Sequence, residues 1–161
     1  MATAKAAELV TAARAAGRGT AAFNVITLEH AEAITAAAEA AALPVILQIS
    51  ENAVAFHGGR VEPLLAGAAA VARAAAVPVG LHLDHVESEE LLRAGVAAGV
   101  DSVMYDASKL GYEENVRATA RVTEWAHRHG VWVEAENTRV TASSSLVDMP
   151  ERPRPPRCWV R

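Results

Sequence analysis

The chain has 161 residues, which is the usual length of one domain and enough to bury a hydrophobic core. Its formal charge of -4, without a basic stripe, gives no support for nucleic-acid binding. The single cysteine, Cys158, excludes an internal disulfide framework and fits a reducing compartment, so we expect a cytoplasmic protein. The longest apolar stretch, residues 64–80, is interrupted by Arg73 and Pro78 and is therefore not a membrane span.

The sequence alternates between helical and extended patterns up to residue 136. In chain order it predicts a helix over residues 3–16, a strand over 20–25, a helix over 28–42, a strand over 44–49, a polar loop over 50–60, a helix over 62–76, a strand over 78–83, a helix over 88–98, a strand over 101–105, a helix over 112–128 and a strand over 131–135. Thr27 and Ser88 are candidate N-caps, and Gly17, Gly99 and Gly130 are suitable helix ends.

This alternation of apolar strands with helices predicts βαβ units and a parallel sheet. Two architectures use the pattern: the closed (β/α)8 barrel and the open doubly wound sheet. No Gly-x-Gly-x-x-Gly follows a predicted strand, which weakens the dinucleotide-binding version of the open sheet. The pattern thus predicts an α/β protein with about five parallel strands.

Residues 137–161 differ in composition from the rest of the chain. They hold four of the seven prolines, five arginines and the run Ser143-Ser144-Ser145, and they follow no regular period. We therefore divide the chain into an α/β domain over residues 1–136 and a Pro/Arg/Ser-rich tail over residues 137–161, which we expect to be irregular or disordered.

The most informative segment is Val79-Gly80-Leu81-His82-Leu83-Asp84-His85, in which an apolar strand ends in a carboxylate flanked by imidazoles. Asp106 and Glu136 also follow apolar strands. Because the carboxyl ends of parallel strands meet at one edge of the sheet, we expect these side chains to lie close together. Imidazole nitrogens and carboxylate oxygens are ordinary zinc ligands, and a carboxylate beside a cation can be oriented for proton transfer.

Each of these residues also has a structural interpretation. Asp84 is a possible helix cap, Asn24 and Asp106 are possible turn residues, and Glu136 a possible surface residue. His82, two residues before Asp84, shares its face of the strand and is better explained by packing or orientation than by metal binding.

Several blocks together resemble the class II, metal-dependent fructose- and tagatose-bisphosphate aldolases. In chain order they are Ala22-Phe23-Asn24-Val25, Pro44-Val45-Ile46-Leu47-Gln48-Ile49-Ser50-Glu51, Leu81-His82-Leu83-Asp84-His85, Ser102-Val103-Met104-Tyr105-Asp106-Ala107-Ser108, Tyr112-Glu113-Glu114-Asn115-Val116 and Val133-Glu134-Ala135-Glu136. The resemblance covers roughly residues 3–136 and implies the N-terminal portion of a TIM barrel, which in full has roughly 250 residues.

The resemblance implies zinc-assisted cleavage of a ketose bisphosphate into dihydroxyacetone phosphate and an aldehyde. By matching positions, Asp84 is the expected catalytic acid/base. His85, Asp106 and Glu136 are the expected metal-binding residues. Asn24 and Ser50 are expected near the substrate. The family is usually homo-oligomeric, so the expected partners are a phosphorylated ketose and further copies of the chain, with no nucleic acid or membrane.

The chain departs from the family pattern at two kinds of position. Val86 stands where the family usually has glycine, and its side chain is expected to crowd a tight turn. After Glu136 the family continues with further βα units that supply two more zinc histidines, whereas this chain has no histidine after His129. We therefore expect a truncated aldolase, with a catalytically inactive remnant or gene-model fragment as the alternative.

Overall fold

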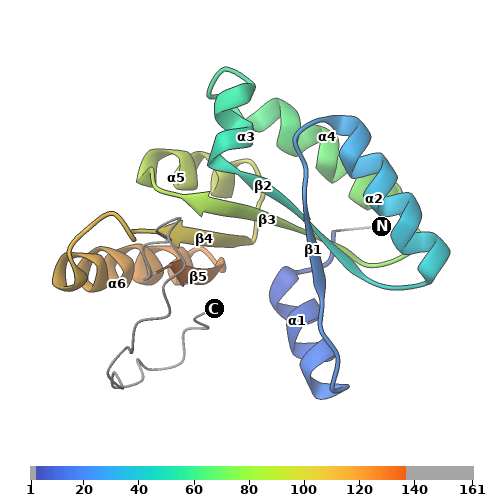
Figure 1. Ribbon diagram of the computed structural model, residues 1–161, viewed down its shortest axis with the longest axis horizontal. Helices are drawn as coiled ribbons and strands as arrows, with labels where there is room; N and C mark the ends of the chain where they lie inside the picture. Colours follow the sequence, from blue (N-terminus) through green and yellow to red (C-terminus); the bar gives the residue numbers. More distant parts are fainter. Residues whose placement is uncertain (1–2, 137–161) are drawn as a thin grey trace, which may run out of the picture.

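The computed structural model describes residues 3–136, which form an α/β domain (Figure 1). Its elements, in chain order, are α1 (Ala6–Ala15), β1 (Ala21–Asn24), α2 (Leu28–Ala41), β2 (Val45–Ser50), α3 (Glu51–Phe56), α4 (Val61–Ala74), β3 (Val79–Val86), α5 (Glu89–Ala97), β4 (Ser102–Asp106), α6 (Tyr112–Arg128) and β5 (Trp132–Glu136). The five predicted strands and the helices between them are confirmed. The prediction for residues 137–161 lies outside the described residues.

The five strands form one parallel sheet in the order β1-β2-β3-β4-β5. Helices α2, α4, α5 and α6 cover one face of this sheet, and α1 lies against the other (Figure 1). A doubly wound sheet has crossover helices on both faces, whereas sequential order with those helices on one face is the arrangement of a barrel wall. The structure therefore decides between the two architectures that the pattern left open.

The two faces of the sheet are buried in different ways. The helix-covered face carries the main core, in which Leu47, Leu83 and Val103 are fully buried. On the opposite face, Ile46 of β2 packs with Ala6 and Leu9 of α1 in a small apolar cluster. We call this opposite face the inner face. Because side chains alternate along a strand, every second residue of each strand lies on it, and toward the carboxyl ends of the strands these residues are polar. They make up the candidate active site.

Two sequence predictions require correction. The polar loop predicted over residues 50–60 is wrong in part, because Ser50 accepts a hydrogen bond from the Ala53 amide at 3.2 Å and caps the helix α3. The strand predicted over residues 78–83 ends three residues too early, since β3 continues to Val86 and contains both Asp84 and His85. Thr27 and Ser88 are confirmed as the N-caps of α2 and α5.

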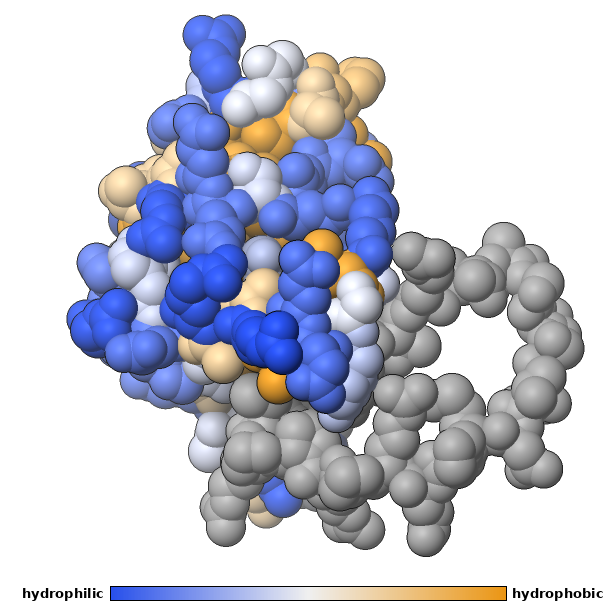
Figure 2. All heavy atoms as spheres, turned by 90° about the vertical axis from the view of Figure 1, so that its left-hand side faces the viewer, coloured by the Kyte–Doolittle hydropathy of each residue, from blue (hydrophilic) through white to orange (hydrophobic). Residues whose placement is uncertain are grey.

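The surface of the domain is uneven in polarity. The face over α5 and α6 is largely hydrophilic (Figure 2). Beside β1, by contrast, α1 and α2 border an apolar hollow of about 770 Å³, and Phe23 and Leu43 on its wall are 51% and 48% exposed. Among residues 3–136, no helix has the length and apolar character needed to cross a membrane.

Candidate active site

A chain of polar contacts crosses the inner face of β1, β2 and β3. The Gln48 amide donates from Nε2 to Asn24 Oδ1 at 3.1 Å and to Asp84 Oδ2 at 2.9 Å. Asp84 is 7% exposed, and Gln48 is the register partner of His82, two residues before the Ser50–Asp84 pair and on the same face of the sheet. The Asp84 carboxyl is thus held from the β2 side by an amide donor, and it does not cap α5, whose N-cap is Ser88.

His82 extends these contacts to β4 and β5. Its Nδ1 lies 2.6 Å from Ser102 Oγ, and its Nε2 lies 3.9 Å from Asp84 Oδ1 and 3.8 Å from Glu134 Oε2. His82 and Ser102 are buried. All five strands therefore contribute a polar side chain to one face of the sheet.

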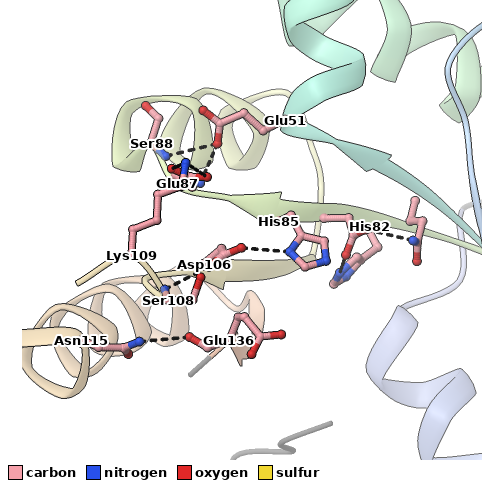
Figure 3. A network of polar contacts seen from close by, with 12 residues as sticks. Glu51, His82, His85, Glu87, Ser88, Asp106, Ser108, Lys109, Asn115 and Glu136 are labelled. Carbon is pink, nitrogen blue, oxygen red and sulfur yellow. Dashed lines mark hydrogen bonds and ion pairs between the residues drawn. The ribbon is translucent and has the colours of Figure 1, made fainter. Parts of the chain in front are cut away.

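His85 occupies an unusual backbone conformation at the carboxyl end of β3. Its φ of 49° is in the left-handed region, and the pairing of β3 with β4 shifts register between Leu83 and Val86. Such a conformation in a residue other than glycine costs of order 1–3 kcal/mol and is a common feature of functional sites. It turns the imidazole toward β4, where Nδ1 donates to Asp106 Oδ2 at 2.9 Å (Figure 3).

The His85–Asp106 contact sets the charge at this end of the sheet. The hydrogen bond to Asp106, assisted by the charges of Asp84 and Glu136, raises the pKa of His85 against the opposing effect of burial. Burial acts to raise the pKa of Asp106, but hydrogen bonds from Ser108 and His85 outweigh it and hold that pKa below the ordinary value. The pair therefore favours an ionised carboxylate and a histidine whose Nδ1 is committed to it.

The remaining predicted residues lie around this pair. Glu136 is the register partner of Asp106, and its main-chain oxygen accepts a hydrogen bond from Asn115 Nδ2 at 3.1 Å (Figure 3). Asp106 also accepts a hydrogen bond from the Ser108 amide at 3.0 Å, which agrees with its turn interpretation, while its role as a metal-binding residue stays a prediction. Ser50 pairs with Asp84 across β2 and β3 while its hydroxyl caps α3.

Three polar residues of this face were not selected from the sequence: Gln48, Ser102 and Glu134. Each lies within a run that reads as an apolar strand, and the signal that could have found them is the two-residue period. Counting back in steps of two from Ser50 and Glu136 reaches Gln48 and Glu134. Polar residues two positions apart within an apolar strand therefore indicate which residues lie on the inner face.

These residues fit only part of the zinc site that the resemblance implies. His85 has the form of a metal ligand, because a carboxylate holds its Nδ1 and leaves Nε2 as the second ring nitrogen. Within residues 3–136, however, no three His, Cys, Asp or Glu side chains are arranged to hold a metal ion. A catalytic zinc needs three protein ligands, so this part of the chain does not hold a complete zinc site.

The expected crowding at Val86 is absent. Val86 is fully buried in the helix-side core, pairs with Tyr105 of β4, and has no positive φ. The sharp turn falls one residue earlier, at His85, where the side chain points away from that core. A valine is therefore accommodated after the Asp-His pair.

Comparison with known proteins agrees with this geometry. The sequence model of the fructose-bisphosphate aldolase class-II family matches residues 4–152. Fructose-bisphosphate aldolases of Thermus caldophilus and Geobacillus stearothermophilus are 43% and 47% identical over 145 and 116 residues, which is 90% and 71% of this chain. The crystal structure of the YdjI aldolase from Escherichia coli K12 superposes with a TM-score of 0.77 at 32% identity, covering 86% of this chain.

The matches cover only part of each relative. The aligned region is 47% of the Thermus caldophilus aldolase, 40% of the Geobacillus stearothermophilus aldolase and 53% of the YdjI chain, so this chain spans about half their length. Within that half, the order of strands and helices is that of the aldolases, which confirms the barrel portion that the resemblance implied. The chain belongs to the class II fructose-bisphosphate aldolase family.

Proposed function

We propose that this chain acts as a zinc-dependent class II aldolase, which cleaves a ketose bisphosphate such as fructose or tagatose bisphosphate into dihydroxyacetone phosphate and an aldehyde. The observation that carries the proposal is the Asp84-His85 pair at the carboxyl end of β3, with Asp84 bonded to Gln48 and His85 bonded to Asp106. Substrates of barrel enzymes bind at this end of the strands. We further propose that the protein is cytoplasmic and assembles with copies of itself.

In this proposal Asp84 is the acid/base. Cleavage of the bond between two carbinol carbons requires a base to take the proton of the hydroxyl whose carbon becomes the aldehyde. Asp84 is suited to this role because the Gln48 amide fixes one of its oxygens while the carboxyl faces the inner side of the sheet. Asn24 and Ser50 are on neighbouring strands of the same face and are proposed to contact the substrate.

His85 is the proposed zinc ligand of this half of the site, through Nε2. Asp106 orients it through Nδ1, and Glu136 adds negative charge beside the pair. Zinc held there would supply Lewis-acid polarisation of the substrate ketone. The other protein ligands would come from outside residues 3–136 or from another subunit.

A second candidate function is a non-catalytic member of the family. It is favoured by one observation: the described residues hold no group of three side chains able to bind a metal ion. Such a protein would keep the barrel-wall fold and the inner-face contacts without turnover. It predicts a folded chain that takes up no stoichiometric zinc.

The two candidates are separated by turnover and metal content measured on the same preparation. We would assay the purified full chain for cleavage of fructose 1,6-bisphosphate with added zinc, and measure bound zinc by mass spectrometry. Asp84→Asn is the matched control, because it keeps the size of the side chain and an acceptor for Gln48 while removing the base. Chelator-sensitive turnover that is lost in Asp84→Asn supports the aldolase. A folded chain without zinc or turnover supports the second candidate.

A further inference from the structure

His82 is a buried imidazole that the proposed reaction does not use. It lies two residues before Asp84 on the inner face of β3 and is 5% exposed. Its two nitrogens face different strands: Nδ1 is 2.6 Å from Ser102 Oγ of β4, and Nε2 is 3.8 Å from Glu134 Oε2 of β5. Nε2 also lies 3.9 Å from Asp84 Oδ1 of its own strand.

These neighbours determine where the ring carries its proton. A bare Nε2 lone pair would face two carboxyl groups at under 4 Å, and that repulsion is strong because buried surroundings screen it poorly. Nε2 therefore bears the hydrogen. In the neutral ring Nδ1 is then an acceptor, and the Ser102 hydroxyl donates to it.

The consequence falls on the Asp84 carboxyl. Gln48 Nε2 donates to its Oδ2 at 2.9 Å, and the positive end of the His82 N–H dipole lies 3.9 Å from its other oxygen, Oδ1. At 3.9 Å the second interaction is a charge–dipole attraction and not a hydrogen bond. The two together oppose rotation of the carboxyl group, which either one alone would allow.

We propose that His82 is a positioning residue, held by Ser102, whose Nε2–H fixes the orientation of the Asp84 carboxyl together with Gln48. The proposal rests on the proposed function for the identity of Asp84 as the base. Replacing His82 is expected to change proton transfer and not substrate affinity, because His82 lies two residues farther than Asp84 from the carboxyl end of β3, where the substrate is proposed to bind. A misplacement of about 1 Å in a reacting group costs up to about 100-fold in rate.

Two substitutions separate positioning from filling. His82→Asn retains a polar atom near the position of Nδ1, so it keeps a partner for Ser102 and loses the donor that faces Asp84. His82→Gln reaches the position of Nε2 and restores an N–H there. If His82 positions Asp84, crystal structures should show the Gln48–Asp84 hydrogen bond broken or lengthened in His82→Asn and retained in His82→Gln. An Asp84 carboxyl that is unmoved in His82→Asn overturns the proposal.

Nitrogen-15 NMR of the histidine-labelled full chain tests the tautomer without any substitution at His82. The expected result is that the His82 ring carries its proton at Nε2, and a spectrum in which the His82 ring is protonated at Nδ1 alone contradicts the proposal. Ser102→Ala, which removes one oxygen, keeps the test available if the His82 variants do not fold. It should replace the single tautomer by a mixture, and an unchanged spectrum counts against Ser102 as the residue that holds the ring.

Turnover adds the kinetic test. We expect kcat to fall about 10- to 100-fold in His82→Asn with KM unchanged, and to recover at least in part in His82→Gln. Equal losses in the two variants that follow their melting temperatures would assign His82 to the core and overturn the proposal. If the unsubstituted chain has no turnover, the proposed function of the isolated chain fails, whereas the tautomer and the crystal structures still decide whether His82 orients Asp84.

Discussion

Gly95 of α5 offers a quantitative test of how closely the helix layer packs on the sheet. A Cβ placed at Gly95 would overlap Leu83 Cδ1 and lie 3.6 Å from Val100 Cγ1. Leu83 is fully buried in β3 and cannot swing toward solvent. Overpacking of a core costs about 1–3 kcal/mol, whereas glycine to alanine inside a helix gains about 1 kcal/mol. Gly95→Ala should therefore lower the free energy of unfolding by up to about 2 kcal/mol.

Gly67 of α4 provides the matched control. A Cβ there meets Leu28 Cδ1 at 3.2 Å, and Leu28 is 43% exposed, so its side chain can move aside. Gly67→Ala should keep most of the helix gain and stabilise the chain by about 0.5–1 kcal/mol. Urea unfolding of the full chain, followed by circular dichroism, measures both changes. If Gly95→Ala stabilises the chain as much as Gly67→Ala does, α5 does not pack against Leu83 of β3 closely enough to exclude a methyl group.

Three further predictions concern polar groups. Burial raises the pKa of Asp101, so at a pH between the unfolded and the folded pKa the folded chain keeps a proton that the unfolded chain has released, and ionisation of Asp101 weakens the fold as pH rises. Asp101→Asn should therefore raise the melting temperature near pH 7 but not near pH 3, and a difference independent of pH would contradict this. Ser50→Ala removes the acceptor for the Ala53 amide and should cost about 1 kcal/mol in a denaturant titration, with a smaller loss refuting its role as a cap. Gln48→Glu places a carboxylate against that of Asp84 and should destabilise the chain by about 1–3 kcal/mol at pH 7 and by less in acid. If the variant and the unsubstituted chain have equal melting temperatures at both pH values, Gln48 does not contact Asp84.

Most of the fold could be predicted from local patterns, because the signals are short-range. The apolar run of β2 and the N-caps Thr27 and Ser88 are written in neighbouring residues, and each element they predict is confirmed. The helix α3 was missed because Glu51–Phe56 is too short to show a helical period and its start depends on one Ser50 hydrogen bond. The choice between barrel wall and doubly wound sheet was beyond local patterns, since it depends on which face each helix covers.

The site was predictable in its residue types and not in its contacts. Asp84, His85 and Asp106 could be selected because polar residues at the ends of apolar strands share one sheet edge. The left-handed backbone of His85 leaves no mark on residue type, and it is this turn that brings Nδ1 to Asp106. Whether these residues bind metal and act in catalysis remains a prediction to be tested by the assays above.

The division between the two faces of the sheet explains why chemistry and stability can vary separately in this fold. On the outer face, buried residues such as Leu83 contribute only packing, so a substitution there changes the unfolding free energy and leaves the polar contacts in place. On the inner face, His82 and Asp84 are buried polar groups, which cost stability unless each has a partner. The partner of Asp84 is Gln48 of β2, and the partner of His82 is Ser102 of β4. Because these contacts are connected across the strands, removing one side chain weakens the hydrogen bonds of the others. Double-mutant cycles should therefore give coupling between Gln48 and His82, because the two side chains lie beside different oxygens of the Asp84 carboxyl. Either residue should be additive with Gly95.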